Sequence, residues 1–261
     1  MTNKNNSKSG YSEVNGLKMY YELHGQGKPL VLIHGGGSTI QTSFGNAIPL
    51  LSKNRQIIAV ELQAHGRTND RNQSLSFEQD ADDVVQLLKN IQINKADFLG
   101  FSNGGQTTIE IALRHPSMVN KIILASIIFK RSATPAQFWE GFEGATLNAM
   151  PQVLQEEFLA VNNDPVALQN MFNKDVQRMK GFKGWTDEQI SSIKAPTLIM
   201  NGNLDVGSVE HAAEIHRLIP NSELVVLPGG HGQYLGTMES LENGQWKQQY
   251  TIHLIESFLD K

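Results

Sequence analysis

A serine lies between two glycines in the segment Gly100-Phe101-Ser102-Asn103-Gly104, where an apolar run gives way to a helical pattern. This spacing allows a very tight strand-to-helix turn, because glycine has no β-carbon to collide there, and the turn holds the serine hydroxyl out of the sheet. The amide of Asn103 would then lie at a helix N-terminus, which favours a developing oxyanion. The segment predicts a nucleophilic Ser102, the simpler interpretation being a small residue in a glycine-rich turn.

A second glycine-rich loop, His34-Gly35-Gly36-Gly37, directly follows the apolar run 30–33. It could be an ordinary tight turn, but with the serine motif downstream we interpret it as half of an oxyanion hole, with the amide of Gly36 as donor. His34 is then a structural hydrogen-bonding residue rather than a base. Neither a phosphate-binding loop nor a Gly-x-Gly-x-x-Gly fingerprint occurs, which argues against a dinucleotide-binding oxidoreductase.

A nucleophilic serine needs a base, and the base needs an orienting acid. Among the eight histidines, His231 follows the predicted strand 223–227 in a glycine-rich loop, whereas four others lie in or end predicted helices. Asp205 follows the predicted strand 197–200 in the same manner, although it could instead cap the next helix. Parallel strands end at one edge of a sheet, so Ser102, Asp205 and His231 are expected to meet there.

The elements that would position these residues are short apolar runs alternating with helical patterns. Runs of this kind are typical of strands covered on both faces. The predicted strands are 11–14, 17–23, 30–33, 57–60, 96–101, 122–126, 197–200 and 224–227, and the first two are joined by the turn Asn15-Gly16. The predicted helices begin with a capping box at Ser76 and Gln79 and continue at 103–115, 208–218 and 241–259. The fold class is therefore α/β, with a mostly parallel central sheet and helices on both faces.

The interval 127–195 breaks this alternation, because it has helix-like stretches and no strand signal. It is too long for an unstructured loop in a compact domain. We predict a helical cap inserted into a core formed by residues 11–126 and 196–261. The polar residues 1–10 are expected to be a disordered tail.

Composition excludes several classes of protein. The 261 residues include no cysteine, which excludes a disulfide scaffold, a thiolate zinc site and a cysteine nucleophile. A net charge of −4 gives no reason to expect nucleic acid or a membrane surface as partner. The first ten residues show no signal peptide. We expect a cytoplasmic protein with a small-molecule substrate and without a metal or organic cofactor; its oligomeric state is left open.

The sequence resembles the α/β-hydrolase superfamily over nearly its whole length from about Tyr11. The resemblance rests on five segments: His34-Gly35-Gly36, Ala64-His65-Gly66-Arg67, the serine motif, Gly202-Asn203-Leu204-Asp205 and His231. It implies the order nucleophile, acid, base, met here by Ser102, Asp205 and His231, with Gly36 and Asn103 forming the oxyanion hole. Many members have aspartate where this chain has Glu61. Members that carry the acid before the cap have a carboxylate there, and 126–128 offers none, which favours Asp205.

The predicted reaction is acyl transfer to water through an acyl-enzyme. The expected substrate is a small or medium, uncharged, partly apolar ester or lactone. Some apolar cap residues should line the cleft, the candidates being Phe129, Phe138, Trp139, Phe142, Met150, Phe158, Met171, Phe172, Met179, Phe182 and Trp185. A serine nucleophile argues against the dehalogenases and epoxide hydrolases of the superfamily, which attack with aspartate. Carbon–carbon bond hydrolysis, peracid formation by a cofactor-free perhydrolase and a non-catalytic ligand-binding role remain alternatives.

Overall fold

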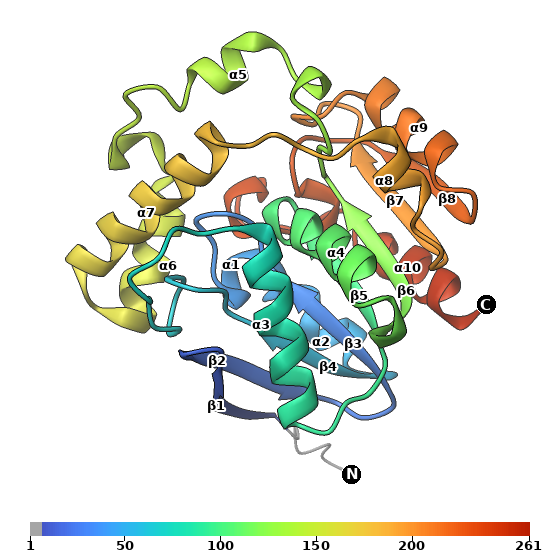
Figure 1. The fold of residues 1–261 in the computed structure, drawn as a ribbon, viewed down its shortest axis with the longest axis horizontal. Helices are drawn as coiled ribbons and strands as arrows, with labels where there is room; N and C mark the ends of the chain where they lie inside the picture. The colour runs from blue at the N-terminus through green and yellow to red at the C-terminus, as the bar shows by residue number, and fades with distance from the viewer. Residues whose placement is uncertain (1–6) are drawn as a thin grey trace.

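The computed structural model describes residues 7–261, and its centre is an eight-stranded sheet in the order β1-β2-β4-β3-β5-β6-β7-β8 (Figure 1). The strands are Lys8–Val14 (β1), Leu17–His24 (β2), Lys28–Ile33 (β3), Arg55–Val60 (β4), Ala96–Phe101 (β5), Val119–Ala125 (β6), Thr197–Gly202 (β7) and Ser222–Leu227 (β8). Strand β2 is antiparallel to both β1 and β4, and the remaining neighbours are parallel. The sheet is therefore mostly parallel, as predicted.

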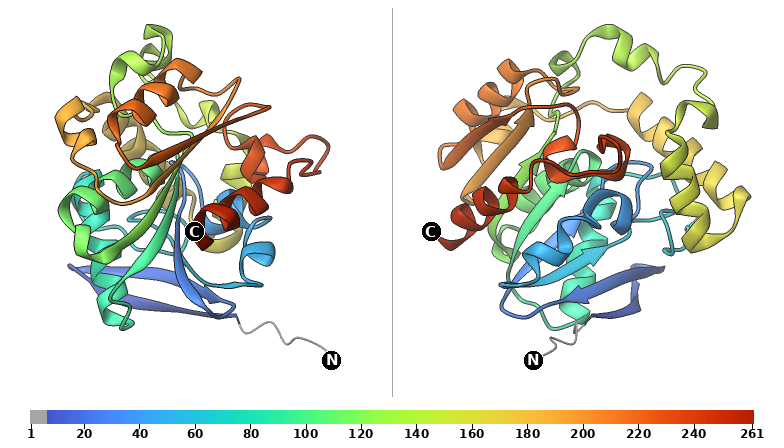
Figure 2. Two further views of the ribbon diagram at one scale, coloured as in Figure 1. Left: turned by 90° about the vertical axis from the view of Figure 1, so that its right-hand side faces the viewer. Right: turned by 180° about the vertical axis from the view of Figure 1, so that it is seen from behind.

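Helices cover both faces of the sheet (Figure 2). Their bounds are Ile40–Phe44 (α1), Ile48–Leu51 (α2), Phe77–Asn90 (α3), Asn103–Arg114 (α4), Ala136–Glu140 (α5), Gln152–Asn162 (α6), Pro165–Lys180 (α7), Asp187–Ser191 (α8), Val209–Leu218 (α9) and Tyr250–Asp260 (α10). One buried cluster joins the sheet to α3, α4 and α9 through Val84, Ile109 and Ile215. The cluster on the opposite face includes Phe44 of α1 and Ile255 of α10. This confirms the predicted α/β class.

Strand β3 shows why the parallel strands have uninterrupted apolar sequences. Val31 and Ile33 belong to the cluster with α3 and α4, whereas Leu30 and Leu32 belong to the opposite one. All four side chains are fully buried. Because successive side chains point to opposite faces and both faces are covered, every position of the strand has to be apolar.

The parallel strands end at one edge of the sheet, and the candidate residues follow these ends. The loop 34–37 follows β3, Ser102 follows β5 and Ser126 follows β6. Asp205 and His231 lie in the loops after β7 and β8. This edge is where ligands of open α/β sheets bind.

The segment between β6 and β7, described throughout, contains α5 to α8 and no strand. The limits predicted for the cap, 127 and 195, fall just after β6 and just before β7. Helix α7 has strong local signals at its start: Pro165 is its first residue, and the Asp164 carboxylate accepts hydrogen bonds from the amides of Val166 and Ala167 at 2.8 and 3.2 Å. Figure 1 shows α5, α6 and α7 outside the layers of the core.

Several predicted boundaries were wrong. Lys8–Gly10, assigned to the disordered tail, belong to β1, because they pair with residues 21–23 of β2; residues 1–6 of that tail lie outside the described chain. The last helix begins at Tyr250 rather than 241. Only half of the capping box forms, since the Ser76 hydroxyl accepts from the Gln79 amide while the Gln79 side chain donates to Asp83.

Helices α1 and α2, between β3 and β4, were not predicted. They have 5 and 4 residues, too few for a helical apolar period to be recognised. No helix within residues 7–261 combines the length and the apolar character needed to cross a bilayer.

Candidate active site

Ser102 occupies a strained turn between β5 and α4. Its backbone angles are φ 51° and ψ −123°, in the region that non-glycine residues rarely adopt. A β-carbon on Gly104 would lie 2.1 Å from the carbonyl oxygen of Ile33, and one on Gly100 would lie 2.2 Å from that of Gly104. The two glycines of the motif are therefore required because the backbone approaches them closely. The sequence analysis explained their spacing by the same missing β-carbon.

Two backbone amides beside Ser102 have no partner among the residues that the structure describes. Neither the N–H of Gly36 nor that of Asn103 donates a hydrogen bond to another residue in the range 7–261, and both residues line the same pocket as Ser102. A β-carbon on Gly35 would lie 3.3 Å from Cβ of Ser102, and one on Gly36 would lie 2.5 Å from Nδ2 of Asn103. The loop 34–37 thus runs directly against the serine turn, so the two free amides can serve an oxyanion.

The carboxylate of Asp205 is held by four donors. Its Oδ1 accepts from Nδ1 of His231 at 2.7 Å and from the Val206 amide at 2.8 Å. Its Oδ2 accepts from the Ser126 hydroxyl at 2.5 Å and from the Gly202 amide at 3.0 Å. These donors fill the lone-pair positions of an ionised carboxylate.

Asp205 is ionised at neutral pH and is not a helix cap. Burial acts to raise the pKa of Asp205, but the hydrogen bond and charge of His231, with the donors on the other oxygen, leave it below its ordinary value. The N-cap of α9 is Ser208, whose hydroxyl accepts from the His211 amide at 3.1 Å. The alternative reading of Asp205 as that cap is therefore excluded.

Ser126 and Tyr234 form a hydrogen-bonded support for Asp205 that the sequence analysis missed. The two hydroxyl oxygens lie 2.8 Å apart, and Tyr234 Oη is 3.0 Å from the carbonyl of Met200. Tyr234 Oη donates to this carbonyl, which also accepts from the Ser126 amide at 2.8 Å, and the Ser126 hydroxyl donates its own proton to Asp205. Burial raises the pKa of Tyr234 well above its ordinary value, so its hydroxyl keeps that proton.

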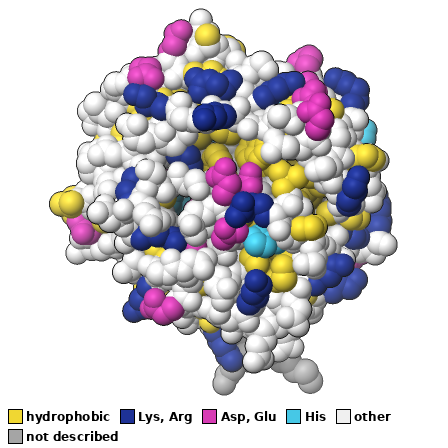
Figure 3. Space-filling model, viewed as in Figure 1, with side chains coloured by type: hydrophobic (Ala, Val, Ile, Leu, Met, Phe, Trp, Pro, Cys, Tyr) yellow, Lys and Arg dark blue, Asp and Glu magenta, His cyan; other side chains and the backbone are white. Residues whose placement is uncertain are grey.

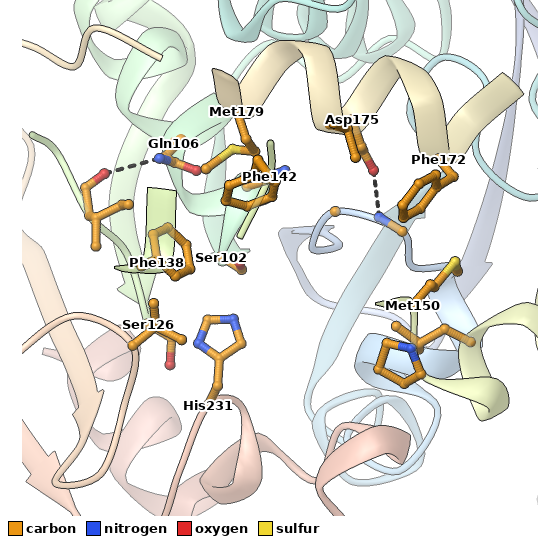
Figure 4. Close-up of a pocket in the computed structure, with 18 of the residues that line it drawn as sticks. Ser102, Gln106, Ser126, Phe138, Phe142, Met150, Phe172, Asp175, Met179 and His231 are labelled. Carbon is orange, nitrogen blue, oxygen red and sulfur yellow. Dashed lines mark hydrogen bonds between the residues drawn. The ribbon is translucent and has the colours of Figure 1, made fainter. Parts of the chain in front are cut away.

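His231 presents its imidazole to the pocket that contains Ser102. Its Nδ1 is engaged by Asp205, and its ring packs on Phe101, the residue before the serine, with 4.8 Å between ring centroids. Figure 4 shows the ring pointing towards Ser102. The Ser102 hydroxyl makes no hydrogen bond with a residue in the range 7–261. Such contacts are often long before substrate binds and tighten in the complex.

The pocket above Ser102 is a cavity of about 300 Å³, at the lower end of the range for small-molecule sites. Six of the eleven apolar cap residues named as candidates line it: Phe138, Phe142, Met150, Met171, Phe172 and Met179. The other five, Phe129, Trp139, Phe158, Phe182 and Trp185, are buried in core clusters instead. The structure thus places an apolar wall of phenylalanine and methionine side chains over the serine.

The polar lining of this pocket is sparse. No lysine or arginine of residues 7–261 lines it, and the side chains in its lining that can carry a charge are His231 and Asp175, the latter from α7 (Figure 4). Within the same residues, no group of three or more histidine, aspartate or glutamate side chains could hold a metal ion. The described lining of the pocket therefore has no lysine or arginine that could pair with an anionic substrate.

Asp175 belongs to a buried network that the sequence analysis did not predict. Its Oδ2 accepts from the Gly37 amide at 2.6 Å and lies 2.9 Å from Nε2 of His65, and its Oδ1 accepts from Arg178. Arg178 also donates to Asp80 of α3 at 2.8 Å. The network therefore joins α7 both to the core and to the loop that contains Gly36.

His34 has the structural role predicted for it. It is fully buried; its Nδ1 lies 2.7 Å from the carbonyl of Gly35, and its Nε2 accepts from the Leu62 amide at 3.0 Å. This pattern requires a neutral ring with the proton on Nδ1. Burial, with the charge of neighbouring His65, lowers the pKa of His34 to about 3.

This lowered pKa predicts a specific acid sensitivity. As the pH falls from 6.5 to 3, residue 34 becomes protonated in the unfolded chain but stays neutral in the folded protein. The free energy of unfolding therefore falls by up to about 1.4 kcal/mol for each pH unit. His34→Gln should therefore lose less stability than the wild type between pH 6.5 and pH 4, measured by urea unfolding at each pH. Equal slopes in the two proteins would contradict the assignment.

The pKa of His65 is shifted in the opposite direction from that of His34. Burial acts to lower its pKa, but the charge and hydrogen bond of Asp175 outweigh burial and raise the pKa of His65. The stability that this group contributes is therefore lost as pH rises through its folded-state pKa above 6.5. His65→Gln should flatten the alkaline side of the stability profile, which His34→Gln should leave alone.

Glu61, the departure from the usual aspartate, is a structural residue. Its buried carboxylate accepts from the amide and the side chain of Arg67 at 2.6 and 2.8 Å and from the Ile40 amide at 3.4 Å. It does not line the pocket. Its contacts therefore lie outside the pocket that contains Ser102.

Comparisons with known proteins identify the family of the chain. A family model described as alpha/beta hydrolase fold matches residues 28–170. The dihydrolipoyllysine-residue acetyltransferase component of the acetoin cleaving system of Pseudomonas putida is 28% identical over 84% of this chain, which spans 63% of that relative. The pimeloyl-[acyl-carrier protein] methyl ester esterase of Vibrio atlanticus is 26% identical over 78% of this chain and 87% of its own length.

The fold also matches solved structures. The meta-cleavage product hydrolase of Pseudomonas fluorescens IP01 superposes with a TM-score of 0.78 at 21% identity, over 96% of this chain and 97% of that one. At this identity the likeness concerns the fold.

Proposed function

Because this chain belongs to the alpha/beta hydrolase fold family, we propose that it is a serine hydrolase of small to medium, uncharged, partly apolar carboxylic esters or lactones. Ser102 is the nucleophile, His231 the base and Asp205 the orienting acid, and the amides of Gly36 and Asn103 form the oxyanion hole. The observation that carries the proposal is the contact of 2.7 Å between His231 and Asp205, beside a serine in a strained turn and two free amides.

In the proposed reaction, His231 takes the proton of Ser102, and Oγ forms a bond to the substrate carbonyl carbon. The carbonyl oxygen becomes an oxyanion that accepts from the two amides. The bond to the leaving alcohol then breaks, and that alcohol takes the proton from His231. Water attacks the acyl-serine by the same steps and releases the carboxylic acid and the free serine.

Asp205 explains why His231 acts through Nε2. The contact with Asp205 holds the proton on Nδ1, so that Nε2 is free to accept the serine proton, and the ionised carboxylate stabilises the imidazolium that results. Esterase activity in the Vibrio relative supports the same reaction class here.

The lining of the pocket supports an uncharged substrate. A carboxylate placed among Phe138, Met150 and Phe172 would lose its hydration without meeting a lysine or arginine, which is costly. The small volume favours short acyl groups.

The substrate prediction is tested with p-nitrophenyl esters of increasing chain length, and with matched esters whose acyl chains end in methyl, carboxylate or ammonium. Short and medium neutral esters should be hydrolysed, and a terminal carboxylate should lower kcat/KM by at least about tenfold. Activity confined to charged or very long acyl groups would overturn the substrate class.

The same preparation separates the remaining alternatives. A β-diketone panel detects carbon–carbon bond hydrolysis, and peroxide with a short carboxylic acid detects peracid formation. A fluorophosphonate probe should label Ser102. A folded protein that is neither labelled nor active would favour a ligand-binding role instead.

A further inference from the structure

We infer that Asp175 is a positioning residue for the oxyanion donor at Gly36: its carboxylate ties the loop 34–37 to helix α7 and so fixes the donor in place. The inference rests on the proposed function, because it concerns the oxyanion hole of that reaction. Asp175 acts through the loop and does not touch the reacting atoms.

The loop 34–37 needs external supports because three of its four residues are glycines, which have wide backbone freedom. The peptide that carries the Gly36 N–H is held from the core, where the carbonyl of Gly35 accepts from Nδ1 of His34 at 2.7 Å. The following peptide is held on both sides: its Gly37 N–H donates to Asp175 at 2.6 Å, and its Gly36 carbonyl accepts from Ser38 Oγ at 3.3 Å. The strongest support of the second peptide therefore comes from α7 (Figure 4).

The hydrogen-bond partners of His65 show that Asp175 supports the loop as a charged carboxylate. Nδ1 of His65 lies 2.8 Å from the carbonyl of Gln63, which can only accept. Nε2 lies 2.9 Å from the carboxylate of Asp175, which also accepts when ionised. Both ring nitrogens must then carry protons, so His65 is an imidazolium paired with Asp175. The Gly37 amide, 3.3 Å from the protonated Nε2, is left to donate to the carboxylate.

The pKa directions agree with this assignment. Burial acts to raise the pKa of Asp175, but the charges of His65 and Arg178 and the Gly37 hydrogen bond hold it far below its ordinary range. A neutral residue at position 175 would leave the imidazolium of His65 buried without a counter-charge, which is strongly unfavourable.

Docking of α7 does not by itself require this carboxylate, because the helix has separate anchors at the surface. Lys174 donates to both oxygens of Asp70, at 2.7 and 2.6 Å, and to the carbonyls of Arg71 and Gln73. Asn170 donates to the same Asp70 at 2.9 Å. None of these residues lines the pocket above Ser102. Lys174 therefore offers a matched control that weakens docking without touching the oxyanion loop.

The experiment compares Asp175→Ala, Asp175→Asn and Lys174→Met with the wild type on a neutral p-nitrophenyl ester. Asp175→Ala should lower kcat by about 10²-fold while KM changes less than about threefold, the effect expected when an oxyanion donor is misplaced. Asp175→Asn keeps an oxygen for the Gly37 amide but no charge for His65, and should lose about tenfold. Lys174→Met should keep kcat within about twofold, although its melting temperature falls.

A second readout reports the oxyanion hole directly. An arylboronic acid forms a tetrahedral anion on the serine oxygen, so its affinity should weaken in each Asp175 variant by the same factor as kcat/KM. Asp175→Asn serves where Asp175→Ala fails to fold, since it keeps the volume of the side chain.

The outcomes separate the inference from the proposed function. Folded Asp175 variants with wild-type kcat and boronate affinity would overturn the inference alone. An equal loss in Lys174→Met would also overturn it, because the effect would then be docking in general. A wild type that neither turns over esters nor reacts with fluorophosphonate would overturn both.

Discussion

Replacing Ser102 with alanine should lower kcat for ester hydrolysis by about 10⁴–10⁶-fold and leave the fold intact. The reaction proposed above passes through a covalent bond to Oγ, and no other hydroxyl lies at a strained strand-to-helix turn beside the free amides of Gly36 and Asn103 within residues 7–261. The measurement is a burst and steady-state assay with a p-nitrophenyl ester, with circular dichroism to verify folding. Fluorophosphonate labelling should disappear in the same variant.

Ser126→Ala is the matched control, because its hydroxyl lines the same pocket. That change removes one of four donors to Asp205 and should cost about tenfold in kcat, while labelling of Ser102 persists. If Ser102→Ala lost less than about tenfold, or if Ser126→Ala lost as much as Ser102→Ala, the nucleophile would be assigned to the wrong residue.

Gly104→Ala should remove most of the stability of the protein, at least about 4 kcal/mol of the free energy of unfolding. The added β-carbon would lie 2.1 Å from the carbonyl oxygen of Ile33 and 2.5 Å from that of His34. Both are backbone atoms, so the clash is relieved only by moving α4 away from the end of β3. Gly104→Val should be worse still. Soluble yield and urea unfolding measure the effect.

Gly181→Ala provides the control for glycine replacement in general. Gly181 ends α7 with φ −80°, and a β-carbon there meets its nearest neighbour at an ordinary 3.5 Å. Its stability should stay within about 0.5 kcal/mol or rise slightly, because alanine restricts the unfolded chain. A Gly104→Ala protein that unfolds at the wild-type urea concentration would contradict the steric account of the serine turn.

The parts of this fold that were predictable are those determined locally. The serine turn, the glycine loop after β3 and the strands carry their cause in neighbouring residues: a missing β-carbon, or a run that must be apolar because both faces are covered. The approach of Asp205 to His231 could also be inferred, since parallel strands end at one edge. The order of the strands is therefore enough to bring Asp205 and His231 together, although they lie 26 positions apart.

The residues that were missed depend on long-range contacts. Asp175 reaches Gly37 across 138 positions, and Tyr234 reaches Ser126 across 108. One signal for Asp175 was present: it interrupts the apolar stripe of Leu168, Met171, Phe172 and Met179 on α7. A carboxylate in such a stripe must find partners when the helix docks. The sequence therefore indicates that Asp175 has buried partners, but it does not identify them.

The overextended last helix has a local cause as well. Residues 241–249 continue the pattern of α10 poorly and contain the turn dipeptide Asn243-Gly244, which the prediction did not use and which has positive φ at both residues in the structure. In the structure Trp246 packs where a β-carbon on Gly236 would lie and donates to the carbonyl of Tyr234 at 3.2 Å. The turn and this tertiary contact together are consistent with a helix that begins only at Tyr250.

The placement of α5 to α8 between β6 and β7 divides the proposed catalytic groups along the polypeptide. A ribosome completes Ser102 and both amides first, then the helices above them, and only afterwards the acid and the base. Because a serine hydroxyl without its base is a weak nucleophile, the proposed triad predicts a nascent chain that is inert towards the carbonyl compounds around it until residue 231 has been added.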